Sequence, residues 1–175
     1  VWEPAMPTGA NVNTNYTYDI GNRLKEVDQV ADANHQHRYF TYDNRGFLNS
    51  ESHPEKDGNV TYLNYDARGH AQEIQDGLAS RNLLFSFDAA ERLLTVTEGG
   101  AGGRILKEFS YGASGNGLGK LLTAKRHNYL GAPFNTDYLV AETYEYNGIG
   151  RRPSKRTTQL TIFGVNQDRK STRLN

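Results

Sequence analysis

The sequence predicts an all-β fold, an antiparallel meander of repeated β-hairpins. A four-residue motif of alternating aromatic and polar residues recurs along the chain, and segments rich in Gly, Asn and Asp separate its copies. The composition agrees, because 11 Tyr, 7 Phe and 18 Gly suit pleated strands joined by tight turns. Only 36% of the residues are hydrophobic, which indicates thin sheets with a solvated face rather than a thick core.

The motif has a regular period. It reads Tyr-Thr-Tyr-Asp at residues 16–19, Phe-Thr-Tyr-Asp at 40–43, Leu-Asn-Tyr-Asp at 63–66 and Phe-Ser-Phe-Asp at 85–88. Looser copies read Phe-Ser-Tyr-Gly at 109–112 and Tyr-Glu-Tyr-Asn at 144–147. The first five copies follow one another every 22–24 residues, and the sixth comes 35 residues after the fifth. A propeller blade needs roughly 40–45 residues, about twice this period, which argues against a β-propeller.

Each copy is interpreted as the start of a hairpin. Its first and third residues point to one face of a strand and its second to the other, because side chains alternate along a strand. The second residue is polar in every copy: Thr17, Thr41, Asn64, Ser86, Ser110 and Glu145. The motif leads into Asp-x-x-Gly, in which Asp bonds the backbone two residues on and Gly takes the positive φ that closes a bulged hairpin.

The residues with an expected structural role are of three kinds. The strand aromatics on the shared face are Tyr16, Tyr18, Phe40, Tyr42, Tyr65, Phe85, Phe87, Phe109, Tyr111, Tyr144 and Tyr146. The turn residues are Asp19, Gly21, Asp43, Gly46, Asp66, Gly69, Asp88 and Gly150, and the second strands start at Leu24, Leu48 and Leu93. We expect the rings of neighbouring hairpins to stack, with roughly 0.2–1 kcal/mol for each cross-strand pair.

A second set of turns returns the chain to the next copy. These turns are expected at residues 28–34, 54–59, 75–80 and 98–103, which are rich in Gly, Asp, Asn, Pro and Ser. Three of the Asp turns depart from the pattern: Gly21 comes one residue early, Glu91 replaces Gly, and Gly112 replaces Asp before an insertion at 114–119. We expect these three turns to differ in type from the others.

The pattern Tyr-x-Tyr-Asp-x-x-Gly-x-Leu resembles the YD repeat of the RHS family, which includes bacterial polymorphic-toxin shell proteins, Tc toxin C components and teneurins. The residues that carry it are 18–24, 42–48 and 87–93, with variants at 116–121 and 146–154, and the resemblance covers about residues 14–165. It implies a β-sheet wound into a spiralling shell around a C-terminal toxic domain, or a rigid surface body that carries recognition. The family's autoproteolytic Asp-Pro motif has no counterpart here.

The chain divides into three expected regions. Residues 1–13 are a partial preceding repeat or linker, and residues 14–167 hold about six YD repeats. Residues 168–175 look like the translation of a common sequencing adapter, so we interpret them as an artefactual tail. Because the chain begins at Val1 in mid-pattern, it is interpreted as an internal fragment of a longer protein.

No residue is assigned a catalytic, cofactor-binding or metal-binding role. The sequence has no Cys, no Gly-x-Ser-x-Gly and no His-Glu-x-x-His, and a Gly-rich segment at 115–120 fails the Walker spacing. His35 and His37 share a strand face, but no third ligand has a diagnostic spacing, so no metal site is expected. His53, His70 and His127 are isolated in the sequence. We therefore do not expect an enzyme.

The predicted function is that of a non-catalytic segment of an RHS-repeat β-shell that encapsulates or presents a C-terminal toxin or effector domain. Its partners are then the rest of its own shell and the enclosed toxin. The alternative is a recognition module that binds glycans or partner proteins through its tyrosines.

A formal net charge of zero predicts no nucleic-acid partner. No apolar run approaches the roughly 20 residues of a membrane span, and no targeting signal is present. The parent protein is expected to be bacterial, and secreted or at the cell surface.

Overall fold

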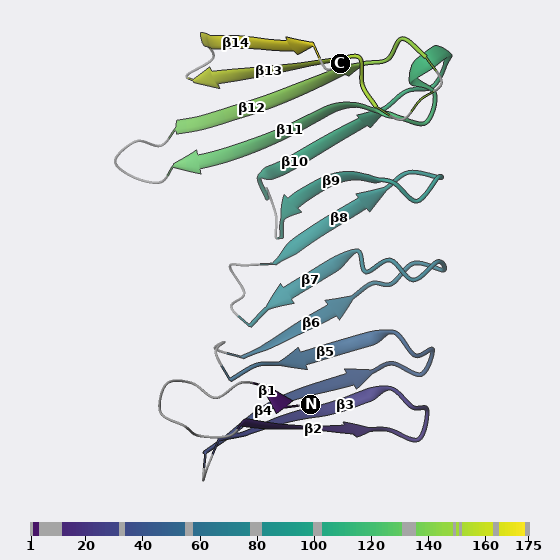
Figure 1. Ribbon diagram of the computed structural model, residues 1–175, viewed down its shortest axis with the longest axis vertical. Helices are drawn as coiled ribbons and strands as arrows, with labels where there is room; N and C mark the ends of the chain where they lie inside the picture. The colour runs from purple at the N-terminus through teal and green to yellow at the C-terminus, as the bar shows by residue number, and fades with distance from the viewer. Residues whose placement is uncertain are drawn as a thin grey trace. The chain divides into compact units, whose positions relative to one another are not determined.

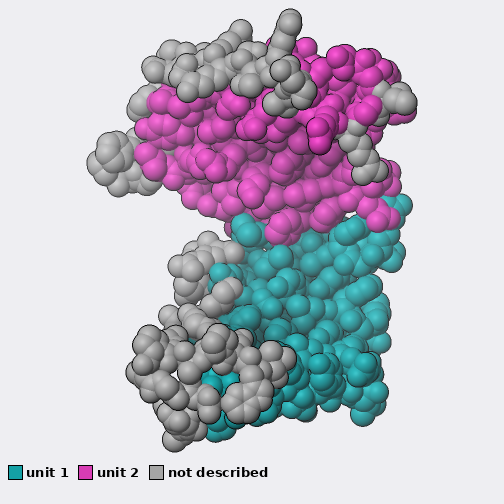
Figure 2. Space-filling view, viewed as in Figure 1, with its two compact units in different colours: residues 1–83 teal, residues 84–175 magenta. Residues whose placement is uncertain are grey.

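The computed structural model describes residues 2–3, 12–31, 34–54, 58–77, 82–99, 103–130, 136–148, 150, 152–162 and 165–173. The described residues form strands joined by turns, with one three-residue 3-10 helix and no α-helix. Among them, no helix is long and apolar enough to cross a membrane. The chain separates into two compact units, residues 1–83 (unit 1) and 84–175 (unit 2; Figure 2).

Unit 1 is an antiparallel meander, as predicted. Each strand is hydrogen-bonded to the next strand along the chain (Figure 1). Its strands are β1 (Trp2–Glu3), β2 (Val12–Tyr18), β3 (Leu24–Ala31), β4 (Asn34–Tyr42), β5 (Leu48–Ser52), β6 (Asn59–Leu63) and β7 (Glu73–Asp76). The register shifts by a bulge beside Tyr18 and Tyr42, where the strands enter the Asp turns, which agrees with the predicted bulged hairpins.

Unit 2 continues the same pattern with longer strands toward its end. From β8 to β14, each strand is hydrogen-bonded to the next (Figure 1). Its strands are β8 (Leu83–Phe87), β9 (Leu93–Glu98), β10 (Ile105–Tyr111), β11 (Leu121–Leu130), β12 (Thr136–Glu145), β13 (Lys155–Ile162) and β14 (Val165–Arg173), with the 3-10 helix η2 (Gly115–Gly117) before β11. Strand β14 includes most of the proposed adapter tail, whose origin stays a prediction.

The first and fourth Asp turns have the same geometry as the second and third, so our prediction that they differ was wrong. In all four, the Asp carbonyl accepts from the N–H three residues on at 3.0–3.2 Å, and the Asp N–H donates to the carbonyl four residues on at 2.9–3.1 Å. The fourth turn residue has positive φ throughout: Asn22 (58°), Gly46 (92°), Gly69 (92°) and Glu91 (66°). Asn22, not Gly21, takes this conformation, which Asn tolerates better than most residues.

The fifth turn does differ, and its geometry explains why Gly112 replaces Asp. The insertion folds back so that a Cβ on Gly112 would lie 2.1 Å from the carbonyl oxygen of Gly117, which leaves room for no side chain. Despite the insertion, the turn closes as the others do, because the Gly112 N–H donates to the Lys120 carbonyl at 2.9 Å and the Gly119 N–H donates to Gly112 at 2.8 Å. Lys120 is therefore the structural equivalent of the residue that follows Asp by four positions in the other turns, such as Arg23 in the first turn.

The first outer turn is much shorter than predicted. We expected a turn over residues 28–34, but β3 runs on to Ala31 and β4 starts at Asn34. Asp28 therefore lies inside a strand, directly opposite His37. The turn-rich composition misled the prediction, because Asp and Gln are tolerated on the solvated face of an exposed strand pair.

The polar face of the strands is exposed, whereas the aromatic face is mostly half-buried. The six polar second positions of the motif are all exposed, as predicted. Five of them bond across to the neighbouring strand, for example Thr41 to Ser50 at 2.7 Å and Ser110 to Thr123 at 2.6 Å. Among the described residues, Val60 and Val96 are the only buried hydrophobic side chains. Hydrogen bonds and side-chain contacts between neighbouring strands therefore carry the fold, rather than a thick core.

Candidate functional site

The carboxylate of each Asp turn organises the backbone around it. In the first turn, Asp19 Oδ1 accepts from the N–H groups of Gly21 and Arg23 at 2.8 and 2.9 Å. The same pair of bonds, to residues two and four positions on, recurs at Asp43, Asp66 and Asp88 at 2.8–3.0 Å. The bond two positions on is the one predicted from the sequence. The bond four positions on leaves Oδ2 free to take a basic side chain.

These contacts lower the pKa of all four carboxyls. The guanidinium bonds of Arg23 and Arg92 do most to lower the pKa of Asp19 and Asp88. The backbone N–H of His70, followed by the bond from its ring, lowers the pKa of Asp66 to about 2. At Asp43, burial opposes the shift, but the bonds from the backbone and from Arg45 outweigh it and lower the pKa.

The basic residue four positions after Asp joins one hairpin to the next. Arg23 donates to Asp19 Oδ2 from Nε at 2.8 Å and from Nη2 at 2.7 Å. Its guanidinium carbon lies 4.8 Å from the centre of the Tyr42 ring, in the following repeat. The Tyr42 hydroxyl donates to the carbonyl of Leu24 at 2.8 Å, back across the hairpin. We call this set of turn carboxylate, basic side chain, tyrosine and leucine carbonyl the repeat joint.

The repeat joint recurs in unit 2 with the same residue types. Arg92 donates to Asp88 at 2.8 and 2.6 Å and lies 4.3 Å from the ring centre of Tyr111, whose hydroxyl donates to Leu93 at 3.0 Å. The fifth turn has no carboxylate, but it keeps the basic side chain over the tyrosine ring and the hydroxyl-to-carbonyl bond. Lys120 Nζ lies 4.7 Å from the ring centre of Tyr146, and the Tyr146 hydroxyl donates to Leu121 at 2.8 Å.

The second turn builds the joint from different residues. Phe47 stands four positions after Asp43 and stacks on Tyr65 with ring centres 4.9 Å apart. Arg45 supplies the charge instead, bonding Asp43 at 2.9 Å and lying 4.9 Å from the Phe47 ring centre. The Tyr65 hydroxyl still donates to the carbonyl of Leu48, at 2.6 Å. The hydroxyl-to-carbonyl bond is thus the shared part of the joint, and the side chain over the ring varies.

A similar arrangement occurs at an outer turn, where the sequence was interpreted only as a Gly-rich loop. Arg104 donates to Glu98 at 2.7 and 2.9 Å and lies 4.6 Å from the ring centre of Tyr129. The Tyr129 hydroxyl donates to the carbonyl of Ile105 at 2.8 Å. The signal in the sequence was an acidic residue followed, across the turn, by a basic and an aliphatic residue, as in Asp19, Arg23 and Leu24.

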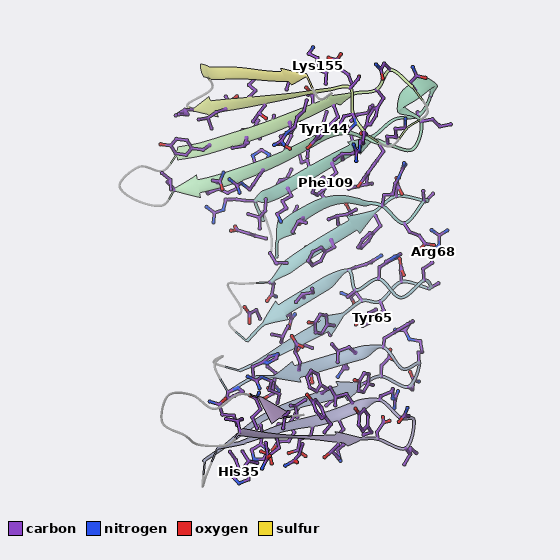
Figure 3. The ribbon with its side chains drawn as sticks, viewed as in Figure 1. His35, Tyr65, Arg68, Phe109, Tyr144 and Lys155 are labelled. Atoms are coloured by element: carbon purple, nitrogen blue, oxygen red, sulfur yellow. The ribbon has the colours of Figure 1, made fainter. Side chains whose placement is uncertain are left out.

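The sequence prediction assigned the contact between hairpins to stacked rings, whereas the joint runs mainly through basic side chains and a hydroxyl. The remaining predicted positions have simpler roles. Phe85 and Phe109 are half-buried on their strands, and Tyr144 donates to Glu142 (Figure 3). Burial, then that bond, raises the pKa of Tyr144 to about 12. Gly150 is exposed.

The first repeat differs from the others in the exposure of its aromatic residues. Tyr16 and Tyr18 are exposed to 46% and 54%. On the neighbouring hairpin, Tyr39 is exposed to 46%. Among the described residues of unit 1 these are the exposed aromatic rings, and the register places Tyr39 on the face of Thr17, opposite to that of Tyr16.

A second cluster lies on the β3–β4 pair. His35 and His37 on β4 are two residues apart, and Asp28 on β3 is the partner of His37 in the strand register. Their ligand atoms all lie within 4.8 Å of one another, and among the described residues this is the one group of three such side chains. Figure 3 shows His35 toward the end of this hairpin, away from the Asp turns. Sequence reasoning missed Asp28 because it placed that residue in a turn.

The comparisons with known proteins give a structural likeness but no match in sequence. No protein-family model matches the chain, and a comparison with curated proteins finds no match. Among solved structures, the chain is similar to one described as "Crystal Structure of TcdB2-TccC3-Cdc42", with a TM-score of 0.48 and 16% sequence identity. The match covers 93% of this chain and 10% of that chain, so this chain spans about a tenth of its length.

Proposed function

We propose that this chain is a non-catalytic structural segment of an RHS-repeat β-shell, whose parent protein encapsulates or presents a C-terminal toxin or effector domain. The observation that carries the proposal is the repeat joint. The same hydroxyl-to-carbonyl bond links Tyr42 to Leu24, Tyr65 to Leu48, Tyr111 to Leu93 and Tyr146 to Leu121. A joint that recurs at four turns, and is interrupted where Phe87 takes the place of the tyrosine, suits a wall that extends by adding hairpins.

The groups of the joint satisfy one another rather than a substrate. Each Asp carboxylate accepts two backbone N–H bonds, and its second oxygen takes a side chain from the same turn. The tyrosine hydroxyl donates to the backbone and its ring is covered by a cation or another ring. A hydroxyl already bonded in this way is poorly placed to act as an acid or base, which supports a structural role.

The test is a long sequencing read of the source DNA through codon 168 and well beyond it. If the proposal is right, Tyr-Asp repeats continue and give way to an Asp-Pro motif and an unrelated terminal domain. The purified parent protein should then protect that terminal domain from protease until its shell is opened. A read that ends in a surface anchor with no terminal domain would contradict the proposal.

Glycan binding is a second candidate, favoured by the exposed rings of Tyr16, Tyr18 and Tyr39. Aromatic rings stack on the apolar faces of sugars, and these three lie on the first hairpins of unit 1. The test is a glycan array probed with the full chain and with a Tyr16→Ser, Tyr18→Ser and Tyr39→Ser variant. Specific binding that the variant loses would support recognition, and equal signals from the two proteins would exclude these rings as a glycan site.

A further inference from the structure

Two strands of unit 1 bring nitrogen and oxygen ligands together on one face. His35 Nδ1 lies 3.0 and 3.2 Å from the two carboxylate oxygens of Asp28. His37 Nδ1 lies 3.7 Å from Asp28 Oδ1 and 2.8 Å from Glu26 Oε1. Asp28 therefore lies between both imidazoles, with the carboxylate of Glu26 on the far side of His37.

These separations are close to those of a metal centre. Zinc binds imidazole nitrogen and carboxylate oxygen at about 2.0–2.2 Å, so two ligand atoms of a tetrahedral site lie roughly 3.3 Å apart. The distances from Asp28 to His35 and His37, 3.0 and 3.7 Å, lie on either side of that value. The ligand nitrogens of His35 and His37 lie within 4.8 Å of each other, so modest side-chain rotation is enough to bring all three ligand atoms around one ion.

The cluster is accessible to an ion and its rings are already ordered. The side chains of His35 and His37 are 49% and 37% exposed, whereas Asp28 is 18% exposed. The two imidazoles stack with centres 5.6 Å apart and planes 9° apart, and His37 stacks in the same way on Tyr39 at 5.7 Å and 8°. Part of the ordering cost of binding is therefore already met in the folded chain.

The chain offers few competing ligands. It contains no Cys and five His, and the other three lie against carboxylates, His53 against Glu51, His70 against Asp66 and His127 against Glu108, without forming a group of three such ligands among the described residues. A single imidazole with one carboxylate holds a divalent transition metal more weakly than two imidazoles with one carboxylate. The pair of histidines thus distinguishes this cluster from an ordinary histidine–carboxylate hydrogen bond.

We propose that Asp28, His35 and His37 form a binding site for a divalent transition-metal ion of the Zn²⁺ class. The two imidazoles and the carboxylate are the borderline ligands that Zn²⁺, Ni²⁺ and Cu²⁺ prefer. Glu26, hydrogen-bonded to His37, orients that ring or supplies a fourth ligand. Water fills the coordination positions that the chain leaves open, because both histidines are solvent-exposed. The site ties β3 to β4 near the outer end of their hairpin.

Isothermal titration of Zn²⁺ into the full chain tests the site. We expect one tight site in the wild-type chain, and His35→Gln or His37→Gln to weaken Zn²⁺ binding by about tenfold or more, since each removes a ligand. Asp28→Asn should weaken it as well. The matched control is His127→Gln, which removes an imidazole hydrogen-bonded to a cross-strand carboxylate but has no second histidine, and it should leave the tight site unchanged.

A second measurement needs no variant that might unfold. Imidazole ¹⁵N spectra of the wild-type chain should show Zn²⁺-dependent shifts at two histidines, with those of His53, His70 and His127 unmoved. Zn²⁺ affinity that is equal in the wild-type chain and the His35→Gln, His37→Gln double variant would overturn the proposal. Shifts spread evenly over all five histidines would overturn it too, because they would indicate weak binding to single imidazoles.

Discussion

The strand pairs β3–β4 of unit 1 and β10–β11 of unit 2 both bring a carboxylate against a histidine of the neighbouring strand, but in different register, because Asp28 lies opposite His37 whereas Glu108 lies opposite Lys125. In unit 2, Glu108 lies opposite Lys125 and diagonal to His127, with Lys125 Nζ at 3.6 Å and His127 Nε2 at 2.9 Å. His127 stacks on Tyr129 with centres 6.0 Å apart. Unit 1 has the same order of residues on β4, with a histidine where unit 2 has Lys125.

The lysine that stands in unit 2 in place of a histidine changes the chemistry of the pair. The hydrogen bond from His127, with the charge of Lys125 adding to it, lowers the pKa of Glu108 and makes this group an ion pair. An ammonium group has no lone pair to offer a metal, whereas the imidazole of His35 has one. Two antiparallel strands can therefore hold either an ion pair or a ligand set, depending on the register and on whether a lysine or a second histidine lies beside the carboxylate.

The units also share the repeat joint but close their turns with different residues. Gly69 in unit 1 and Glu91 in unit 2 both occupy the positive-φ position, at 92° and 66°. The comparison teaches that the turn is imposed by its hydrogen bonds rather than by glycine alone. Glu91 adopts a conformation that costs an L-residue roughly 1–2 kcal/mol, and the two backbone bonds of the turn hold it there.

The largest expected effect is a difference in stability loss between alanine substitutions at the positive-φ positions of the two units. Gly69→Ala should lower the free energy of unfolding by about 2 kcal/mol, because φ is positive and the new Cβ would lie 2.9 Å from the Phe47 ring. Gly46→Ala should cost less, since its Cβ would meet only the end of Arg23 at 3.5 Å. Glu91→Ala should change stability by less than about 0.5 kcal/mol, since Glu91 already bears the backbone cost. Urea unfolding of the three variants checks this order of stability losses. Equal losses in all three would show that backbone φ and the space around the new Cβ do not set the cost.

The next prediction concerns a second histidine introduced beside the unit 2 carboxylate. Lys125→His places a second imidazole beside Glu108 and His127, and should raise Zn²⁺ affinity by at least about tenfold, or about 1.4 kcal/mol. The measurement is Zn²⁺ titration in a chain that also carries His35→Gln and His37→Gln, so that unit 1 does not contribute. Lys125→Gln in the same background is the control. If both variants bind Zn²⁺ equally, residue type at this position is not what distinguishes the two strand pairs.

The third prediction asks whether the repeat joint is equally strong in both units. Tyr42→Phe and Tyr111→Phe each remove one hydroxyl-to-carbonyl bond, and each should lower the free energy of unfolding by about 1 kcal/mol. Tyr16→Phe is the control, because its ring is exposed and it should lose almost nothing. Chemical denaturation measures all three. A loss in the control as large as in the other two would argue against the joint as a source of stability.

The smallest effect concerns acid stability. The folded pKa of Asp66 is lowered to about 2, below its ordinary value, so its ionised form stabilises the fold above about pH 4 and that contribution is lost as pH falls toward 2. Asp66→Asn should therefore flatten the fall in stability between about pH 5 and 2. Asp88→Asn should act in the same direction in unit 2, where the pKa is also lowered. Unfolding midpoints across this pH range test both variants, and parallel curves for wild type and Asp66→Asn would rule out the linkage.

Several features were predictable because they depend on nearby residues. The alternation that exposes Thr41 and Ser110 follows from the two-residue period of a strand, and Asp bonds to the backbone two positions on within its own turn. The turns that seemed exceptional were harder. Asn22 and Glu91 carry the positive φ without glycine, since the two hydrogen bonds that close the turn outweigh the preference of either residue.

By itself, the sequence determined the all-β class, the period of the hairpins and the face on which the polar motif residues lie, because alternation and turn chemistry act over a few residues. Only the tertiary structure decided which residues meet across strands. The Tyr42 hydroxyl finds a carbonyl 18 residues away, and Asp28 lies between two histidines because β3 continues to Ala31. Strand register sets such contacts, and register depends on where each turn falls, which composition alone did not resolve at the first outer turn.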